Sequence, residues 1–212
     1  MNSEFVGILK RANNINRWGL MSQFKNEVLS AHIYETTIIS HVLGVIAKEK
    51  FGEDISPDKV ASMAAFHEAS ESYCGDIPST AKYKNPRIAQ AMKVMEREFE
   101  ESLLQTLPPE FQELYRPYIA QDKSDPHALL AKAADVIAAY AKCQFELSKG
   151  NDEFSSASEE IAEQLSNYQT RLPAVEYFCE HFLEGMFKTV DEQAKSQWVS
   201  VANDFNIRKA SM

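Results

Sequence analysis

Two residues that can bind a metal ion stand side by side at His67-Glu68. An imidazole nitrogen and a carboxylate oxygen together suit divalent Mn, Fe, Co, Ni or Zn ions. Two donors do not fill a coordination sphere, so further ligands must come from elsewhere in the chain. His32 lies upstream and Asp135 lies downstream, both in stretches with the apolar pattern of a helix. If the fold brings these side chains together, they complete a mixed nitrogen and oxygen site, although their spacing does not name the metal.

Each of these residues also has an ordinary structural interpretation. Adjacent His and Glu occur often by chance, and such a pair is more often a helix surface or a hydrogen-bonded core histidine. Asp135 is more informative, because it stands within the apolar run AADVIAA, where a buried carboxylate needs a partner. A metal ion supplies that partner, and a lysine or a helix cap would do the same. Asp135 therefore favours a metal site without requiring one.

Helices are predicted to position these side chains. Apolar residues recur with a helical period from Ser30 to about Phe51. Ser56-Pro57 places a capping residue before a proline at the first helical position, which predicts a second helix that continues to about Tyr73. On that helix His67 and Glu71 are four residues apart and share one face, with Glu68 displaced by about 100°. All three side chains can then border one pocket.

The rest of the chain is predicted to be helical as well, with a turn at INRWGLM near the N-terminus. Gly and Pro are few, at 7 and 8 residues, and no hairpin signal of Asn-Gly or Asp-Gly lies between alternating apolar runs. Further helices are predicted at about 3–12, from Pro86 through IAQAMKVMEREFEESLLQ, around EFQELYRPYI, from Pro126 to about Lys149, in SSASEEIAEQLSNYQ and in PAVEYFCEHFLEGMFKTVDEQ. We therefore expect an all-α protein with one domain over residues 1–212, a core at about 4–192 and a helical tail at 193–212.

Charge and cysteine content limit the classes of partner. The 22 basic and 31 acidic residues give a formal charge of −9, which repels a polyphosphate backbone and argues against binding DNA or RNA. Three widely spaced cysteines form no CxxC pair, which argues against a disulfide framework and a zinc finger and favours reduced thiols in the cytoplasm. No run of apolar residues is long enough to span a membrane. We expect a soluble protein that binds a small molecule.

Several longer motifs resemble the HD-domain phosphohydrolases, and more closely the bacterial 5′-deoxynucleotidases of the YfbR type. The motifs are INRWGLM, NEVLSAHIYETTIISH, FHEASESYCGDIPSTAKY, AKAADVIAAYAKCQFELSKGNDEF and YFCEHFLEGMFKTVDE. The resemblance covers roughly residues 4 to 192. It implies a single HD-domain helical bundle that acts on a small nucleotide and assembles as a homodimer.

Carried over by position, the resemblance assigns the metal and proton chemistry. It implies one divalent ion, with Co, Mn, Zn, Ni, Fe and Mg all open, held by His32, His67, Glu68 and Asp135. It makes Glu71 the residue that handles protons near the attacking water. Taken without the resemblance, Glu71 reads as a solvated helix carboxylate.

The resemblance also assigns four residues to the substrate. Arg17 is implied to bind the phosphate and Trp18 to pack against the sugar, roles that suit a forked guanidinium and a flat indole. Asp76 is implied to accept a hydrogen bond from a sugar hydroxyl, and Lys82 is a weaker match for balancing phosphate charge. Taken alone, Trp18 reads as a core anchor, Asp76 as a turn residue bonded to its own backbone, and Lys82 as a solvated lysine.

Two positions depart from the family pattern. The name-giving motif is His-Asp, whereas this chain has His67-Glu68, whose side chain is one methylene longer. The longer arm must fold back or shift the metal by about a bond length, which changes metal affinity, metal preference or rate. The family has Ser-Glu-His before the first ligand, and here Ala31 replaces that Glu and cannot make its hydrogen bonds.

The function implied by the resemblance is removal of the 5′-phosphate from deoxyribonucleoside 5′-monophosphates. Two alternatives stay open. Some proteins with a similar helical scaffold cleave triphosphates, which leaves a deoxynucleoside triphosphate triphosphohydrolase as one. The other is a nucleotide-binding protein in which the His67-Glu68 motif has lost catalysis.

Overall fold

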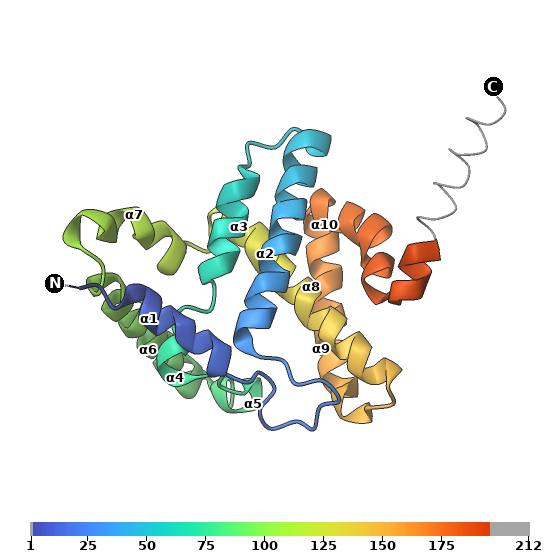
Figure 1. Ribbon diagram of the computed structural model, residues 1–212, viewed down its shortest axis with the longest axis horizontal. Coiled ribbons are helices and arrows are strands. Elements are labelled where there is room, and N and C mark those ends of the chain that lie inside the picture. Colours follow the sequence, from blue (N-terminus) through green and yellow to red (C-terminus); the bar gives the residue numbers. More distant parts are fainter. Residues whose placement is uncertain (1, 196–212) are drawn as a thin grey trace.

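Three helices pack against one another at the centre of the computed structural model, which describes residues 2–195 (Figure 1). They are α2 (Leu29–Val45), α3 (Pro57–Phe66) and α8 (Pro126–Ser148). Their shared core includes the fully buried side chains of Leu43, Val60, Met63 and Ile137. Truncating one such side chain to alanine costs about 2–5 kcal/mol. These three helices therefore share a buried core that holds them together.

Small residues allow these helices to approach closely. A side chain on Gly44 of α2 would place its Cβ 2.7 Å from the Cα of Pro57, at the start of α3. On α8, alanines such as Ala133, Ala134 and Ala138 are buried, which lets α2, α3 and α9 (Ser155–Arg171) pack around it. Close packing of this kind holds side chains from different helices in fixed relative positions.

The predicted helix starts are confirmed by their caps. Ser56 accepts a hydrogen bond from the backbone N–H of Lys59 at the start of α3. Asn85 caps α6 (Pro86–Gln105), and Asp125 caps α8 by accepting from the backbone N–H of His127 at 2.9 Å. In each case the next residue is a proline, which needs no N–H partner in the first turn.

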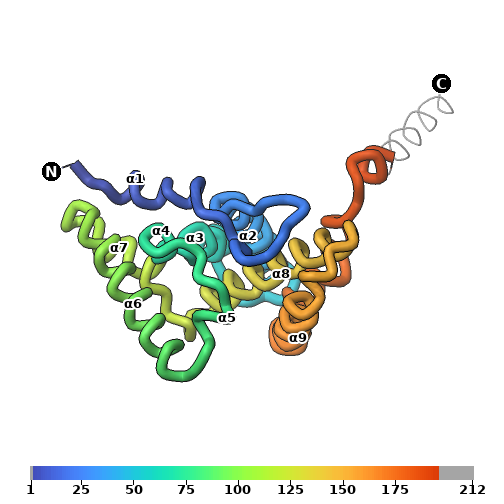
Figure 2. The backbone as a smooth tube through the Cα atoms, turned by 90° about the horizontal axis from the view of Figure 1, so that it is seen from below, coloured from blue at the N-terminus to red at the C-terminus, as the bar shows by residue number. Residues whose placement is uncertain are grey.

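A second, smaller core is formed by elements that lie on the side of α3 away from α8 (Figure 2). It includes Phe5 and Ile8 of the N-terminal helix together with Leu103, Leu104 and Ile119. The helices that contribute to it are α1 (Phe5–Leu9), α4 (Glu71–Cys74), α6 and α7 (Pro109–Ile119), and the short helix α5 (Ser79–Lys82) contacts α6. The two cores meet at the segment between α3 and α4, which carries two of the four predicted metal ligands, His67 and Glu68.

The predicted continuous helix from Ser56 to Tyr73 is wrong at residues 67–70, which form turns between α3 and α4. From His67 to Tyr73 several backbone N–H groups bond to the carbonyl three residues back, for example His67 to Ala64 at 3.4 Å and Glu71 to Glu68 at 3.1 Å. These shorter bonds form a series of tight turns, and α4 begins only at Glu71. His67 and Glu68 therefore lie on a turn, and the helical spacing assumed for Glu71 does not apply.

Other helices also end or change differently from the prediction. α2 ends at Val45 and continues as a π-helical turn, Ile46–Lys50. The late helix is broken into α10 (Pro173–Phe178), a π-helical turn at Cys179–Leu183 and a 3-10 helix at Glu184–Phe187. Of the predicted tail at 193–212, residues 196–212 lie outside the described part of the chain.

The segment between the N-terminal helix and α2 forms a loop closed at its base. Asn16 and Val28 form an antiparallel bridge, and the Leu29 N–H bonds to the Ile15 carbonyl at 2.8 Å. This bridge is the only β pairing among residues 2–195. None of the helices in that range is both long and apolar enough to cross a membrane. The loop carries Arg17 and Trp18.

Candidate metal centre

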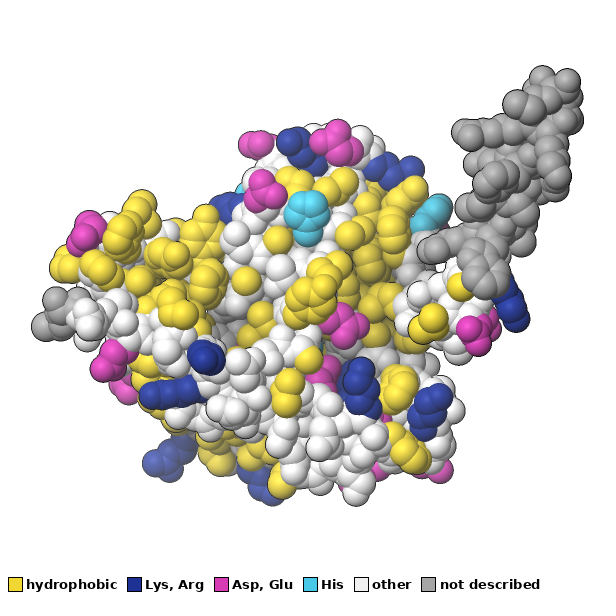
Figure 3. Space-filling view, viewed as in Figure 1, with side chains coloured by type: hydrophobic (Ala, Val, Ile, Leu, Met, Phe, Trp, Pro, Cys, Tyr) yellow, Lys and Arg dark blue, Asp and Glu magenta, His cyan; other side chains and the backbone are white. Residues whose placement is uncertain are grey.

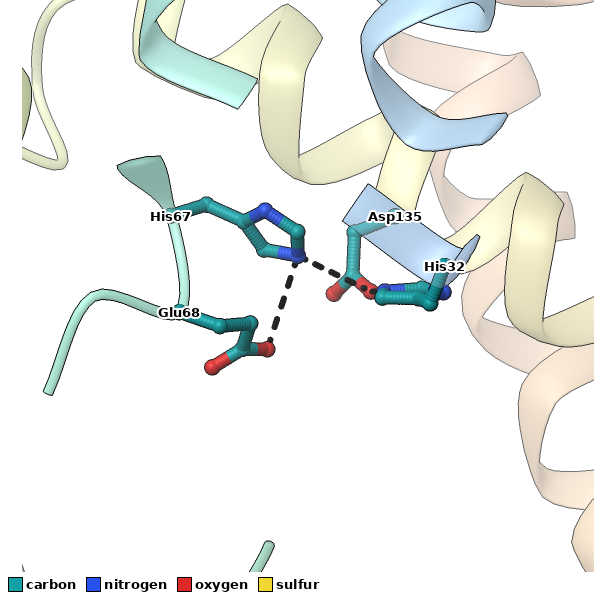
Figure 4. Close-up of side chains that lie close together, drawn as sticks. All are labelled: His32, His67, Glu68 and Asp135. Carbon is teal, nitrogen blue, oxygen red and sulfur yellow. Dashed lines mark hydrogen bonds and ion pairs between the residues drawn. The ribbon is translucent and has the colours of Figure 1, made fainter. Parts of the chain in front are cut away.

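The four side chains predicted to bind a metal meet at one point (Figure 4). They come from α2, from the turn after α3 and from the middle of α8. One nitrogen or oxygen atom from each residue lies within 4.8 Å of the others, and the residues are His32, His67, Glu68 and Asp135. Asp135 Oδ1 lies 2.9 Å from His32 Nε2 and 3.6 Å from His67 Nε2. Glu68 Oε1 lies 3.5 Å from His67 Nε2.

Hydrogen bonds leave ligand atoms free at this point. The Nδ1 of His67 donates to the Ala64 carbonyl at 2.6 Å, which leaves Nε2 with its lone pair directed at the carboxylates. That Nε2 is buried and has no hydrogen-bond partner, and neither has His32 Nδ1. A buried polar atom without a partner costs about 1–3 kcal/mol, which a bound cation would offset at His67. The donor set and this free nitrogen fit a divalent metal.

Burial and charge shift the pKa values of these groups. Burial lowers the pKa of His32, and the nearby Arg17 guanidinium lowers it further, so its imidazole is neutral at neutral pH. Burial alone would raise the pKa of Asp135, but the ammonium of Lys132 and the two histidines hold it well below its ordinary value. Burial alone would lower the pKa of His67, yet Glu68 and Asp135 raise it. A cation would compete with the proton on His67.

Lys132 is a site residue that the sequence did not identify. Its ammonium lies 2.5 Å from Asp135 Oδ2, while Oδ1 faces the histidines. The carboxylate of Asp135 thus has a lysine partner on one oxygen and an open side on the other. The spacing of three residues along α8 was the available signal, because it places Lys132 and Asp135 on one face of the helix.

Glu71 lies beside the predicted ligands and is not a solvated helix carboxylate. Burial raises its pKa to about 9, with further contributions from the negative charges of Glu68 and Asp76. The positive charges of Arg17 and Lys82 act in the opposite direction and lower the pKa of Glu71. Glu71 Oε2 is buried and has no hydrogen-bond partner. Glu71 is therefore able to hold a proton near neutral pH.

Arg17, Trp18 and Asp76 form a second group next to the centre. Asp76 Oδ2 accepts a hydrogen bond from the backbone N–H of Trp18 at 2.9 Å, which joins the loop to the segment after α4. The indole of Trp18 packs on Phe154 with ring centroids 5.3 Å apart. The guanidinium carbon of Arg17 lies 5.8 Å from the Trp18 ring centre. The Asp76 carboxylate therefore bonds the loop and not its own turn.

Lys82 and Ala31 are the two remaining positions that the sequence analysis singled out. The ammonium of Lys82 pairs with Glu96 of α6, so the lysine is neither free nor fully solvated, although its charge reaches Glu71. Ala31, at the position of the family's Glu, is exposed. It supplies no polar group to the neighbouring His32, whose Nδ1 is unpartnered.

A cavity of about 190 Å³ opens beside the centre. Glu68 forms part of its wall, and most other lining side chains are small or apolar, including Ala12, Ile33, Ala65 and Ala69. It lies between the N-terminal segment, the start of α2 and the turn after α3. A cavity with a carboxylate on one wall and an apolar lining suits a small organic ligand with one polar end.

Two further residues that position the loop could not be identified from the sequence. Glu27 bonds both Arg17 and Trp18, and Glu146 of α8 bonds the loop backbone from more than 100 residues away. Glu27 gave a weak signal, since it lies inside the motif NEVLSAH. Glu146 gave no signal for its contact with the loop, because the loop groups that it bonds are backbone N–H groups.

Comparison with known proteins identifies the family. The pattern of the family described as 5′-deoxynucleotidase YfbR-like matches residues 4–186. A 5′-deoxynucleotidase of Vibrio vulnificus is 39% identical over 191 residues, covering 90% of this chain and 97% of that protein. One from Photobacterium profundum is 37% identical over 196 residues, with the same coverage of both chains. These relatives share nearly the full length of the chain.

Solved structures support the same fold. An HD-domain phosphohydrolase from Listeria innocua superposes with a TM-score of 0.74 at 20% identity, covering 95% of this chain and 98% of that one. A cyanophage S-2L HD phosphohydrolase, solved with dA and one catalytic Zn²⁺ ion, superposes with a TM-score of 0.60 at 17% identity, covering 84% and 96%. The all-helical domain has the HD fold, as the sequence predicted. With its family pattern and near full-length relatives, the chain belongs to the YfbR-like 5′-deoxynucleotidase family.

Proposed function

We propose that the protein hydrolyses deoxyribonucleoside 5′-monophosphates to the nucleoside and inorganic phosphate, with one divalent metal ion. The observation that carries the proposal is the cluster of His32, His67, Glu68 and Asp135, whose ligand atoms lie within 4.8 Å of one another. The names of the relatives, which are 5′-deoxynucleotidases, support the substrate class.

The proposed ligands are the two imidazoles and the two carboxylates of this cluster. Mixed nitrogen and oxygen donors suit several first-row divalent ions. Such an ion, when bound, would lower the pKa of a water and polarise a phosphoryl oxygen. His67 is oriented for this role by its Nδ1 bond to the Ala64 carbonyl, and Asp135 by Lys132 on its second oxygen.

The other residues are proposed to bind the substrate and move protons. Arg17 binds the phosphate through guanidinium N–H groups that Glu27 leaves free. Trp18 forms a flat wall for the sugar, and Asp76 keeps Oδ1 free to accept from a sugar hydroxyl while Oδ2 bonds the loop. A water oxygen attacks phosphorus as the P–O ester bond breaks, and the leaving 5′-oxygen takes up a proton. Glu71 is placed to relay protons in this exchange.

The test is a screen of all ribo- and deoxyribonucleoside mono- and triphosphates against Mn, Co, Mg and Zn, with the phosphate product identified. We expect inorganic phosphate from dAMP and the other deoxyribonucleoside monophosphates. Glu71→Gln, which keeps the shape but cannot ionise, is expected to lower kcat about 10²–10⁴-fold while metal binding is retained. Release of triphosphate from dATP, with no turnover of dAMP, would overturn the monophosphatase proposal.

We also propose a homodimer, which the family resemblance implies. Hydrophobic side chains gather over α2 and toward α10 on the face drawn in Figure 3. Tyr34, Ile38 and Val45 of α2 are among the exposed large apolar residues. Exposed apolar residues on one face are common at subunit contacts. Sedimentation analysis is expected to give about twice the 24.0 kDa chain mass, and a monomer at every concentration would contradict the dimer.

A further inference from the structure

One carboxylate oxygen joins the two residues that we assign to phosphate and sugar. Glu27 Oε2 accepts a hydrogen bond from the indole Nε1 of Trp18 at 2.8 Å and lies 3.3 Å from Nη1 of Arg17. The side chains of Arg17 and Glu27 are only 13% and 11% exposed, so water competes little for these contacts. Hydrogen bonds that involve a charged group are also the stronger class.

The backbone fixes Glu27 opposite Arg17. The N–H of Arg17 donates to the Glu27 carbonyl at 2.9 Å, next to the bridge between Asn16 and Val28. The two residues therefore face each other across the base of the loop, as cross-strand neighbours do. The position of the Glu27 carboxylate is set by this pairing before any substrate binds.

Trp18 needs such a contact because its backbone is strained. Its φ of +59° lies in the left-handed region that non-glycine residues rarely adopt, at a cost of about 1–3 kcal/mol. A residue in this conformation stays there only when its surroundings hold it. Here Asp76 holds the backbone N–H, Phe154 packs on the ring and Glu27 holds the indole N–H. Of these three contacts, the Glu27 bond fixes the rotation of the indole.

We propose that Glu27 is a positioning residue that sets discrimination between deoxyribo- and ribonucleotides. The inference rests on the proposed function, because it takes Trp18 as the sugar wall and Arg17 as the phosphate ligand. By holding both groups on one oxygen, Glu27 fixes the distance between wall and phosphate. A rigid wall excludes a sugar with one more hydroxyl, whereas a wall free to rotate makes room for it.

The test compares variants at Glu27 with a control variant at another residue that contacts the same loop. Glu27→Ala removes the shared acceptor, and Glu27→Gln keeps an acceptor for the indole without the charge. The control is Glu153→Ala, because Glu153 Oε2 accepts from the backbone N–H of Ser22 in the loop at 2.9 Å but bonds neither Arg17 nor Trp18. Binding of dAMP and AMP is measured by calorimetry with Mn²⁺, alongside kcat and KM.

We expect Glu27→Ala to lower the ratio of dAMP to AMP affinity at least tenfold, with KM for dAMP changed more than kcat. Glu27→Gln is expected to stay within about threefold of the starting protein, and Glu153→Ala to leave the ratio unchanged. An unchanged ratio in Glu27→Ala, or an equal loss in Glu153→Ala, would overturn the inference. So would equal affinity of the unmodified protein for dAMP and AMP.

Two further comparisons keep the test decisive. If Glu27→Ala does not fold, Glu27→Asp decides, because its arm is one methylene shorter and cannot reach both partners. A retained ratio in a folded Glu27→Asp would then overturn the inference. If the unmodified protein binds dAMP but turns over no nucleotide with any metal, the proposed function fails, while the affinity ratio still tests Glu27.

Discussion

Glu68 illustrates how a single residue is accommodated at the candidate centre. Its carboxylate is one methylene longer than the family's Asp, yet Oε1 lies 3.5 Å from His67 Nε2 and within 4.8 Å of the other predicted ligand atoms. The reason is the tight turn after α3, which presents adjacent residues to the same point. On a continuous helix these neighbours would diverge by about 100°. The longer arm is therefore compatible with a four-ligand site.

Shortening this arm tests whether the site is adapted to glutamate. We expect Glu68→Asp to withdraw the oxygen by about a bond length and to weaken Mn²⁺ binding about tenfold, with a loss of activity. Metal titration followed by a dAMP turnover assay measures both effects. The opposite outcome, no turnover in the starting protein and activity gained in Glu68→Asp, would support the catalytically impaired nucleotide-binding protein.

Among the elements, α8 carries both the centre and the anchor of the substrate loop. Asp135 and Glu146 are about three turns apart and so lie on one face of the helix. Glu146 is fully buried and accepts from the backbone N–H groups of Phe24 at 2.9 Å and Lys25 at 3.2 Å. Lys142 pairs with Glu146 at 2.5 Å and donates to the Lys25 carbonyl at 2.6 Å. One helix therefore sets the distance between the metal ligands and the loop.

The anchor should make stability depend on pH. Burial alone would raise the pKa of Glu146, but hydrogen bonds from Lys142, Asn151 and the loop backbone lower it to about 2. A lowered pKa in the folded state means that the unfolded chain binds the proton first. The contribution of Glu146 is therefore complete above its ordinary pKa and is lost as the pH falls from about 5 toward 2.

Replacing Glu146 tests this contribution. Glu146→Gln leaves Lys142 buried without its counter-ion, so we expect a loss of about 3 kcal/mol in the free energy of unfolding at pH 7. The loss should shrink as the pH falls toward 2. Urea denaturation from pH 7 to pH 3 measures both, with the exposed Glu153→Gln as control. A loss that stays constant across this range would contradict an ionised Glu146.

The elements also show what the sequence could and could not predict. Helix starts were predictable because capping is local, as at Ser56-Pro57 and Asp125-Pro126. The end of α3 was not predictable, because backbone hydrogen bonds to the carbonyl three residues back and four residues back differ little in the local sequence that they require. Packing against the surrounding cores decides between the two kinds of bond. The metal cluster was predictable only through long motifs. The role of Glu146 as the loop anchor was not, since its partners in the loop lie over 100 residues away and are backbone N–H groups that any sequence would supply.

In the whole molecule, the candidate centre lies where the two cores meet. His32 comes from α2, Asp135 from α8, and His67 and Glu68 from the turn that leads into the smaller core. A metal bound there would join all of these parts. It would therefore stabilise the entire domain and not only one loop.

Metal removal should lower thermal stability. Metal at a hundred times its Kd adds about 2.7 kcal/mol, which corresponds to about 5–10 °C in Tm for a domain of this size. We expect Mn²⁺ to raise Tm by this amount and a chelator to reverse it, as followed by calorimetry. His32→Ala should abolish the shift, whereas His41→Ala should keep it because His41 is exposed. A shift that survives His32→Ala would contradict the assigned ligand.

The separation of these ligands along the chain has a consequence for biosynthesis. Residues emerge from the ribosome in order, and Asp135 follows His32 by 103 positions. A nascent chain that has exposed α2, α3 and the turn after α3 displays His32, His67 and Glu68 but lacks the aspartate from α8. The loop anchor at Glu146 emerges later still. Binding of a metal by all four proposed ligands would therefore follow the synthesis of α8, which would make it a late event in translation.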